Sequence, residues 1–501
     1  MLGATRRGAF TYVAGAAMAG VGCLSGAQPV TAQTAGKRVR RDVSTKTGAA
    51  NLVIYRNAIR YMQSLASTDR RSWAYQVSIH NNWCPHRNWY LLPWHREYLL
   101  ALERIIRGLP TADVPNAASF AMPYWNWTKN PRLPTAFTTS KNSDGTPNAL
   151  YNATRKLAAN GSIPSEAVSP ATMQGIYQLT KFPAFGSSAV TAKDSQRRAV
   201  TMGSLEGIPH NTVHNTIGGD MATMFSPRDP IFFLHHANVD RIWASWNRQG
   251  KANPTETAWR NRTFASNFAR ANGDLYSVIV RNISDAEYVY DSYDPAPASS
   301  AMASTFAPES EWIQVAAAGP LTGLLDASGS RVRVANRRRA TFGSPAAIPV
   351  GLKGCRRGGR QEAAVRLIDI ASPTLANAPL VRIFVNHPAP APNLPPEGPH
   401  YVGTFSFFGT AAQHQALEVV EPSSGQRFGA ADLCISSPSD AEAKAAASVS
   451  VELPLTQTLR RLEAAGRPVG DVLTVQLVPV ALGATPGQVE IEPEAIEVEF
   501  S

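Results

Sequence analysis

The sequence has no long apolar run and no internal repeat. No run reaches the roughly 18 apolar residues that a membrane-spanning helix needs, so no transmembrane segment is expected. The missing repeat speaks against a solenoid or other repeat array. With 501 residues, of which 44% are hydrophobic and 17% charged, the chain can bury a sizeable interior. That length predicts a globular protein of at least two domains.

Acidic residues are outnumbered by basic ones. The chain has 48 Lys and Arg against 37 Asp and Glu, a formal net charge of +11. The excess is concentrated between residues 331 and 360, where no aromatic interleaving and no nucleic-acid motif accompany it. This pattern favours a solvated basic face, with no nucleic-acid partner expected and an anionic surface or polymer as the alternative.

Residues 1–32 have the features of an export signal. Paired Arg6 and Arg7 precede a mildly apolar stretch, and small residues end it at Ala32. The arginine pair, followed by Phe10, is similar to the twin-arginine type of signal. We therefore expect an exported protein, periplasmic or secreted, with lipid attachment at Cys23 as a minor alternative.

The residue pattern changes near residue 294. Before it, apolar residues recur at helical spacing over 53–79 and from Pro93 to Leu109, a third helix is expected from His210, and Asp229-Pro230 announces a fourth. After residue 300 the runs are short and alternating, which predicts an all-β domain. Residues 130–200 read as long surface loops. We expect a helical domain over 45–293, a linker over 294–308 and the β-domain over 309–501.

Seven of the ten histidines lie in the helical half, in two clusters. The first cluster is His80, His86 and His95, and the second is His210, His214, His235 and His236. His210 and His214 are four residues apart, so a helix places both on one face. Pro93 separates His86 from His95 and allows the first cluster to converge on one ion.

The ligand types indicate the metal. His235 and His236 point about 100° apart on a helix, so only one of them can face the site, and the spacing alone does not decide which. Two sets of three neutral imidazoles, without carboxylate or thiolate ligands, suit copper better than zinc. Two such sets in one helical bundle suggest a binuclear centre.

These motifs resemble the tyrosinase and polyphenol oxidase family of type-3 copper proteins. The similar segments are His80 with Cys84-x-His86, LPWHREYL at 92–99, PYWNW at 123–127, EGIPHNTVHN at 206–215, DPIFFLHHANVDRIW at 229–243 and Tyr288-Val289-Tyr290. The resemblance implies a four-helix bundle that holds two copper ions, with dioxygen as co-substrate. It also implies that a C-terminal β-domain covers the site and keeps the enzyme latent.

Carried over by position, the resemblance makes His80, His86 and His95 the ligands of one copper ion and His210, His214 and His236 those of the other. It also implies a thioether between Cys84 and His86; without it, Cys84 would be read as a small buried hydrophobe. Asp240, one turn after His236, could orient a ligand imidazole through its other nitrogen. An ion pair with Arg241 is the equal alternative.

The implied reaction is oxidation of phenols by dioxygen. A monophenol is hydroxylated at the ortho position, a catechol is oxidised to an o-quinone, and a copper chaperone would be an accessory partner. Glu206 resembles the family's glutamate that holds a water, and Asn215 the asparagine that polarises it. Alternatively, Glu206 favours a helix N-terminus and Asn215 lies on the surface.

Other functions remain open. A catechol oxidase would act on o-diphenols only, and an oxygen carrier would resemble the haemocyanins. An exported zinc hydrolase would want a carboxylate ligand or an open ligand position. Cys355 and Cys434 could form a disulfide, a pairing that the sequence leaves open.

Overall fold

The structure of the protein is a computed structural model. It describes residues 36–189, 201–295 except 283 and 285, 363–371, 380–388, most of 394–408, 448–467, 472–480 and most of 491–500, and short strands between 311 and 341. Several expected features lie outside the described residues. They are the export signal with Cys23, most of the linker and of the basic 331–360 segment, and both Cys355 and Cys434. No described helix is long and apolar enough to cross a membrane.

The helical pattern over 53–79 is not one helix, contrary to our expectation. Helix α1 covers Lys46–Ser64 and helix α2 covers Trp73–Trp83. Between them, the Asp69 carboxylate accepts hydrogen bonds from the backbone and the guanidinium of Arg71. The Ser72 hydroxyl then accepts from Tyr75 N and starts α2. Local capping therefore outweighs the apolar periodicity.

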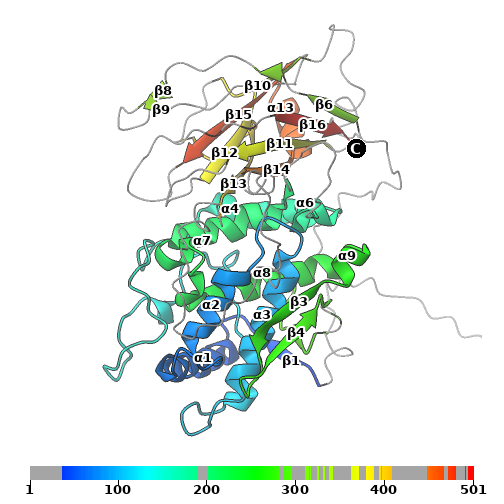
Figure 1. The fold of residues 1–501 in the computed structure, drawn as a ribbon. Helices are drawn as coiled ribbons and strands as arrows, with labels where there is room; N and C mark the ends of the chain where they lie inside the picture. The colour runs from blue at the N-terminus through cyan, green and yellow to red at the C-terminus, as the bar shows by residue number, and fades with distance from the viewer. Residues whose placement is uncertain are drawn as a thin grey trace, which may run out of the picture. The chain divides into compact units, whose positions relative to one another are not determined.

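The longest buried helices are α3 (Leu91–Arg107) and α8 (Ile231–Arg248), which pack against each other (Figure 1). Helix α3 begins two residues before the expected Pro93 start. Helix α8 begins one residue later than predicted, with Pro230 at the N-cap position, and the carboxylate of Asp229 accepts a hydrogen bond from Ile231 N. Nearly every residue of both helices is buried, which explains their apolar sequences.

A π-turn precedes the helix expected at His210. Element η3 (Glu206–His210) contains Pro209, and α7 (Asn211–Ile217) continues from it. The N–H of Asn211 donates to the carbonyl of Glu206, five residues back. Such π-turns are frequently found at functional sites.

Residues 130–200 are not only loops. They contain the 3₁₀ turn η2 (Thr135–Phe137) and the short helices α4 (Ser165–Val168), α5 (Pro170–Gln178) and α6 (Phe182–Gly186). Further on lie α9 (Thr257–Arg260) and the hairpin of β3 (Thr263–Ala269) and β4 (Leu275–Ile279). Strand β1 (Arg38–Arg40) pairs in parallel with β5 (Tyr288–Tyr290).

The C-terminal region contains two five-stranded sheets. One has the order β13-β12-β15-β10-β7 and the other β2-β14-β11-β16-β6. Their strands are β2 (Thr201–Met202), β6 (Glu311–Gln314), β7 (Ala316–Ala317), β10 (Arg338–Thr341), β11 (Ala363–Ala371), β12 (Leu380–Val385), β13 (Tyr401–Ser406), β14 (Ser448–Pro454), β15 (Val472–Val480) and β16 (Ala495–Phe500). The strands β8 (Leu324–Leu325) and β9 (Arg331–Val332) form a separate pair.

The alternating runs predicted an all-β region, but the region also contains a helix. Helix α13 covers Thr456–Ala464, and its Leu459 and Leu462 are buried three residues apart, on one face. The helical and strand regions are also joined. Strand β2 lies between α6 and η3 in the chain and pairs with β14, and Arg382 forms an ion pair with Glu166. The described residues from Arg38 onward belong to one compact unit.

Candidate metal centre

The first histidine cluster converges as expected. His80 lies on α2, His86 on the loop after it and His95 on α3. Their ligand atoms and the Sγ of Cys84 all lie within 4.8 Å of one another, and the group is buried. Ligand atoms this close together can bind a single metal ion. The loop and the α3 start bring together residues that one continuous helix would separate.

The second cluster forms an equally tight group. His210 ends η3, His214 lies on α7, and His235 and His236 lie on α8. Their ligand atoms also lie within 4.8 Å of one another. The sequence prediction that the seven histidines form two sets is therefore consistent with the geometry.

Four of the rings are oriented by hydrogen bonds at Nδ1. The Nδ1 atoms of His80, His95 and His214 lie 2.6–2.8 Å from the backbone carbonyls of Met224, Leu91 and Met221. The Nδ1 of His210 lies 2.8 Å from the side-chain oxygen of Asn211. An oxygen acceptor at Nδ1 requires the proton there, so Nε2 keeps its lone pair. This orientation is typical of metal-binding histidines.

The residues present fit a pair of copper ions. The Nε2 of His210 is buried without a hydrogen-bond partner, and the Nε2 atoms of His214 and His236 lie 3.2 Å apart. Burial lowers the pKa of His210 to about 4 and those of His86, His95, His214, His235 and His236 well below their ordinary value. The rings are therefore neutral, which is the form that binds metal.

His235 and His236 have different environments. The indole Nε1 of Trp127 donates a hydrogen bond to Nδ1 of His235 at 3.3 Å. A neutral imidazole that accepts at Nδ1 carries its proton on Nε2, so neither nitrogen of His235 offers a free lone pair. The Nδ1 of His236 accepts no such bond, and its Nε2 faces His214. This difference favours His236 as the ligand.

The two sets adjoin. The rings of His95 and His236 stack, with centroids 3.9 Å apart and planes 5° apart. The ring centroids of His86 and His210 lie 5.9 Å apart. The ring of Phe232 packs against His80 and His236. Rings of the two histidine sets are therefore in direct contact within the buried core.

Cys84 is buried between two of the histidines. Its Sγ lies 3.3 Å from Nε2 of His95 and 3.8 Å from Nε2 of His86. The sulfur is therefore within reach of the His86 ring, although it is nearer to His95. The description of Cys84 as a small buried residue also holds, since its exposure is 8%.

Glu206 is buried and held at both oxygens. The backbone N–H of Arg87 donates to Oε1 at 2.5 Å, and the hydroxyl of Ser187 donates to Oε2 at 2.7 Å. Burial raises the pKa of Glu206 to about 7, against the opposing effect of these two donors and of the Arg87 charge. The carboxyl group can therefore exchange a proton near neutral pH. Glu206 is also the first residue of η3, so the alternative position at a helix start holds as well, although the side chain is buried there.

Asn215 is 9% exposed, so it is not a surface residue. Its side-chain nitrogen donates to the hydroxyl of Ser406 at 2.8 Å and to the carbonyl of Phe407 at 2.6 Å. Asn211 donates in the same way to the carbonyl of Ser406. The end of β13 therefore binds α7 directly.

Phe408 follows this contact and covers the histidines. Its ring centroid lies 4.2 Å from that of His214, 5.0 Å from that of His86 and 5.8 Å from that of His210. It therefore touches rings of both sets. Phe408 was not among the predicted site residues, because only the fold brings the end of β13 to α7. The aromatic run YVGTFSFFG at 401–409 was the available signal in the sequence.

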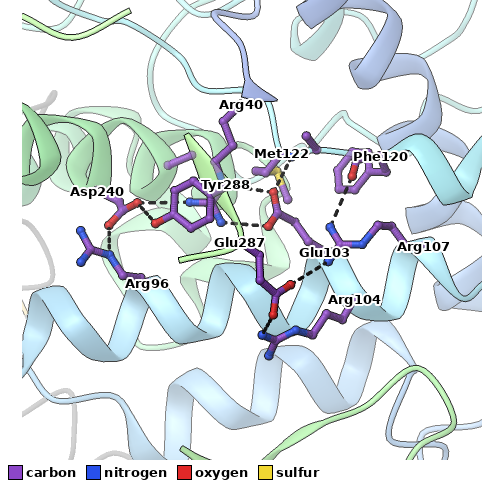
Figure 2. Close-up of polar contacts among 12 residues, drawn as sticks. Arg40, Arg96, Glu103, Arg104, Arg107, Phe120, Met122, Asp240, Glu287 and Tyr288 are labelled. Carbon is purple, nitrogen blue, oxygen red and sulfur yellow. Dashed lines mark hydrogen bonds and ion pairs between the residues drawn. The ribbon is translucent and has the colours of Figure 1, made fainter. Parts of the chain in front are cut away.

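Asp240 has neither of the two roles expected for it. Its carboxylate accepts from Nε of Arg96 at 2.7 Å and from Nη1 of Arg40 at 3.2 Å (Figure 2). The hydroxyls of Tyr288 and Tyr290 donate to it as well. The expected partners are engaged otherwise: Arg241 pairs with Asp294, and Nδ1 of His236 has no hydrogen-bond partner.

The Asp240 carboxylate is buried, and two arginines stabilise its negative charge. Burial opposes the charge of Asp240, but Arg96 and Arg40 outweigh it and hold the pKa of this carboxyl below its ordinary value. Arg40 also binds both oxygens of Glu103, and its guanidinium lies 3.5 Å from the ring centroid of Tyr288 (Figure 2). We define these six residues, Arg40, Arg96, Glu103, Asp240, Tyr288 and Tyr290, as the arginine network. The network ties α3 and α8, which carry His95 and His236, to β1 and β5.

The comparisons with known proteins agree with this geometry. Residues 70–249 match the family model of the common central domain of tyrosinase. A tyrosinase from a Hahella species is 30% identical over 289 residues, which is 48% of this chain and 60% of that protein. A chloroplastic polyphenol oxidase of Vitis vinifera is 31% identical over 286 residues, 49% of this chain and 46% of that protein. The match thus spans about half the length of these curated relatives.

Solved structures extend the likeness of the fold beyond the helical region. A latent aurone synthase, a polyphenol oxidase, has a TM-score of 0.62 at 21% identity, with 93% of this chain and 89% of that chain covered. A latent apple tyrosinase has a TM-score of 0.61 at 20% identity, with 93% and 97% covered. At these identities the likeness concerns the fold, and it includes the C-terminal region.

Proposed function

We propose, from the premise that this chain carries the central domain of the tyrosinase and polyphenol oxidase oxidoreductases, that it is a tyrosinase. It would hydroxylate monophenols at the ortho position and oxidise o-diphenols to o-quinones. The observation that carries the proposal is the pair of adjoining histidine sets, together with a buried carboxylate beside them whose pKa is about 7. Because the match spans about half of the curated relatives, the activity is a proposal.

His80, His86 and His95 would hold one copper ion, and His210, His214 and His236 the other. These ligands lie on α2, the loop after it, α3, η3, α7 and α8. When bound, the copper pair supplies the binding and reduction of dioxygen and accepts the electrons of the phenol. The protein orients four of these rings, those of His80, His95, His210 and His214, through hydrogen bonds at Nδ1, which leaves their Nε2 atoms to bind the ions.

Glu206 and Asn215 would serve the monophenol step. A phenol has a pKa of about 10 and must lose its proton near neutral pH. Glu206, with a pKa of about 7, can accept that proton directly or through a water, provided that its carboxylate is held towards the substrate. The amide of Asn215 would polarise the same water. A catechol needs only oxidation. Glu206 and Asn215 would therefore be required for monophenol hydroxylation but not for catechol oxidation.

The C-terminal region would keep the enzyme latent. Phe408 packs against His86, His210 and His214, in the space where a phenol ring would have to enter. Ser406 and Phe407 also engage the amide of Asn215, which then is not free to hold a water. The likeness of the whole fold to two structures of latent enzymes supports this reading.

Three further features are proposed: a thioether, export and delivery of copper by a chaperone. A thioether would join Cys84 to a ring carbon of His86: the S–H and C–H bonds break, a C–S bond forms, and two protons and two electrons leave, with dioxygen as the electron acceptor. Intact-mass analysis of the copper-treated protein should show the loss of two hydrogen atoms, and Cys84→Ser should not.

Export through the N-terminal signal, by the twin-arginine route, and delivery of copper by a chaperone are also proposed.

The test is oxygen uptake and quinone absorbance of the copper-loaded full chain, with tyrosine and with a catechol, before and after limited proteolysis. Activity on both substrates supports a tyrosinase. Activity on the catechol alone would identify a catechol oxidase, the second candidate. Reversible oxygen binding without quinone formation would indicate a haemocyanin-like carrier, and no oxygen chemistry at all would refute the proposal.

A further inference from the structure

Ser187 has a backbone conformation that is rare for a residue with a side chain. Its φ is +74° and its ψ is 155°, a region occupied almost only by glycine. The residue is 1% exposed. Such a conformation persists only where the surroundings impose it, and it is found mostly at functional sites. A glycine would fit this position without strain, so the side chain requires an explanation.

The hydroxyl of Ser187 has a defined direction. The backbone N–H of Gly203 donates to its oxygen at 2.8 Å, and the hydroxyl is 2.7 Å from Oε2 of Glu206. A serine hydroxyl has one proton, and the carboxylate is an acceptor, so that proton points to Glu206. A Cβ on Gly203 would lie 2.2 Å from Ser187 N, so the two chain segments are in direct contact.

The second donor to Glu206 also has a positive φ. Arg87, whose backbone N–H binds Oε1, has φ +58°. Only five non-glycine residues in the described part of the chain have positive φ, and two of them hold this one carboxylate. Arg87 directly follows the ligand His86, and Glu206 lies in the π-turn that ends at His210. The carboxylate is therefore held by the residue that follows one histidine ligand, and it belongs to the turn that ends at another.

We propose that Ser187 is a positioning residue for the monophenol step: its hydroxyl fixes the orientation in which the Glu206 carboxylate meets the substrate's proton. The proposal rests on the proposed tyrosinase function and adds a residue to it. Ser187 acts through Glu206 and does not touch substrate or metal. Its loss should therefore impair proton removal from a monophenol and leave catechol oxidation intact.

The experiment compares Ser187→Gly, Ser187→Ala and Asn116→Gly in the copper-loaded full chain after identical limited proteolysis. Ser187→Gly removes the hydroxyl and relieves the backbone, whereas Ser187→Ala removes the hydroxyl alone. Asn116 is exposed with φ +63°, so its glycine variant controls for the backbone effect. We expect both Ser187 variants to lower kcat for the monophenol roughly 10- to 100-fold, with KM and catechol turnover unchanged. Asn116→Gly should change neither activity.

Equal losses with both substrates, or no loss in Ser187→Gly, would overturn the proposal. A wild type that hydroxylates no monophenol would refute the tyrosinase function instead. A second measurement then decides on Ser187: the melting temperatures of Ser187→Gly, Glu206→Ala and the double variant. If Ser187 holds Glu206, the two effects are not additive; additive effects would show that the pair is not coupled.

Discussion

The imidazole of His95 stacks on that of His236, with 3.9 Å between the ring centroids and 5° between the planes. The two residues come from different histidine sets and from the two long helices α3 and α8. Because both helices are buried along their length, the stack fixes how the sets face each other. Two ions bound to these sets would lie next to each other. The proposed oxidation of phenols requires this, because both ions take part in it.

The choice between His235 and His236 can be tested by copper content. His236→Ala should lower the copper bound from two ions to one per chain and abolish quinone formation, since His236 faces His214. His235→Ala should retain two ions, because Trp127 occupies Nδ1 of His235. Copper analysis after dialysis measures both. Loss of an ion in His235→Ala alone would reverse the assignment.

Phe408→Ala should activate the full chain without proteolysis. Burial of a phenylalanine side chain stabilises by about 1.5–3 kcal/mol, so its removal should raise catechol turnover roughly 10- to 100-fold. The quinone assay on untreated protein measures this. Phe405→Ala, a buried change nearby on β13, is the control for general loosening and should activate less. An untreated Phe408→Ala variant as inactive as the wild type would contradict the cover by Phe408.

The contact of Asn215 with Ser406 and Phe407 predicts that opening the site is not enough for hydroxylation. In Phe408→Ala these two hydrogen bonds remain, so Asn215 stays engaged. The ratio of monophenol to catechol turnover should therefore be lower in the untreated variant than after proteolysis of the same variant. The ratio is measured with both substrates on one preparation. An equal ratio before and after proteolysis would mean that the hydrogen bonds to Ser406 and Phe407 do not keep Asn215 from taking part in hydroxylation.

Several features of the site were predictable from the sequence because they follow from local spacing. The rings of His210 and His214, four residues apart, lie 4.7 Å apart between their centroids, and α8 begins directly after Asp229-Pro230, within one residue of the predicted start. The short alternating runs after residue 300 likewise form strands. These signals depend on the residues themselves and on few neighbours.

Other features could not be predicted from the sequence, mostly because they depend on contacts between distant segments. The partner of Asp240 is Arg96, 144 residues away, and that of Asn215 is Phe407, 192 residues away. The break between α1 and α2 was missed because caps at Asp69 and Ser72 override the apolar pattern. The unusual φ of Ser187 has no sequence signature, since glycine is the residue that would indicate it.

The arginine network should be important for stability. Asp240→Ala leaves Arg40 and Arg96 buried with less compensation, and removal of one partner from a buried ion pair costs about 3–5 kcal/mol. Tyr288→Phe removes one hydrogen bond to the same carboxylate and should cost about 1–2 kcal/mol. Urea unfolding of the metal-free variants measures both. A smaller loss in Asp240→Ala than in Tyr288→Phe would contradict this account.

Acid should destabilise the metal-free protein through its histidines. The pKa of His210 is lowered to about 4 by burial, so between about pH 6.5 and 4 the unfolded chain binds a proton that the folded chain does not. Stability is therefore full above pH 6.5 and falls as the pH decreases, by on the order of 3 kcal/mol from this ring alone. The other buried histidines act in the same direction.

Glu206 acts in the opposite direction, because its raised pKa of about 7 makes the folded chain bind the extra proton below that pH. One carboxyl group cannot offset the histidines. Urea unfolding between pH 7 and 5 should show a falling free energy of unfolding, with a steeper fall in Glu206→Gln and a shallower one in His210→Asn. Copper should shift the whole curve upward, since the ions bind only the folded, deprotonated site. A free energy of unfolding that stays constant over this range would mean that the rings are not buried neutral.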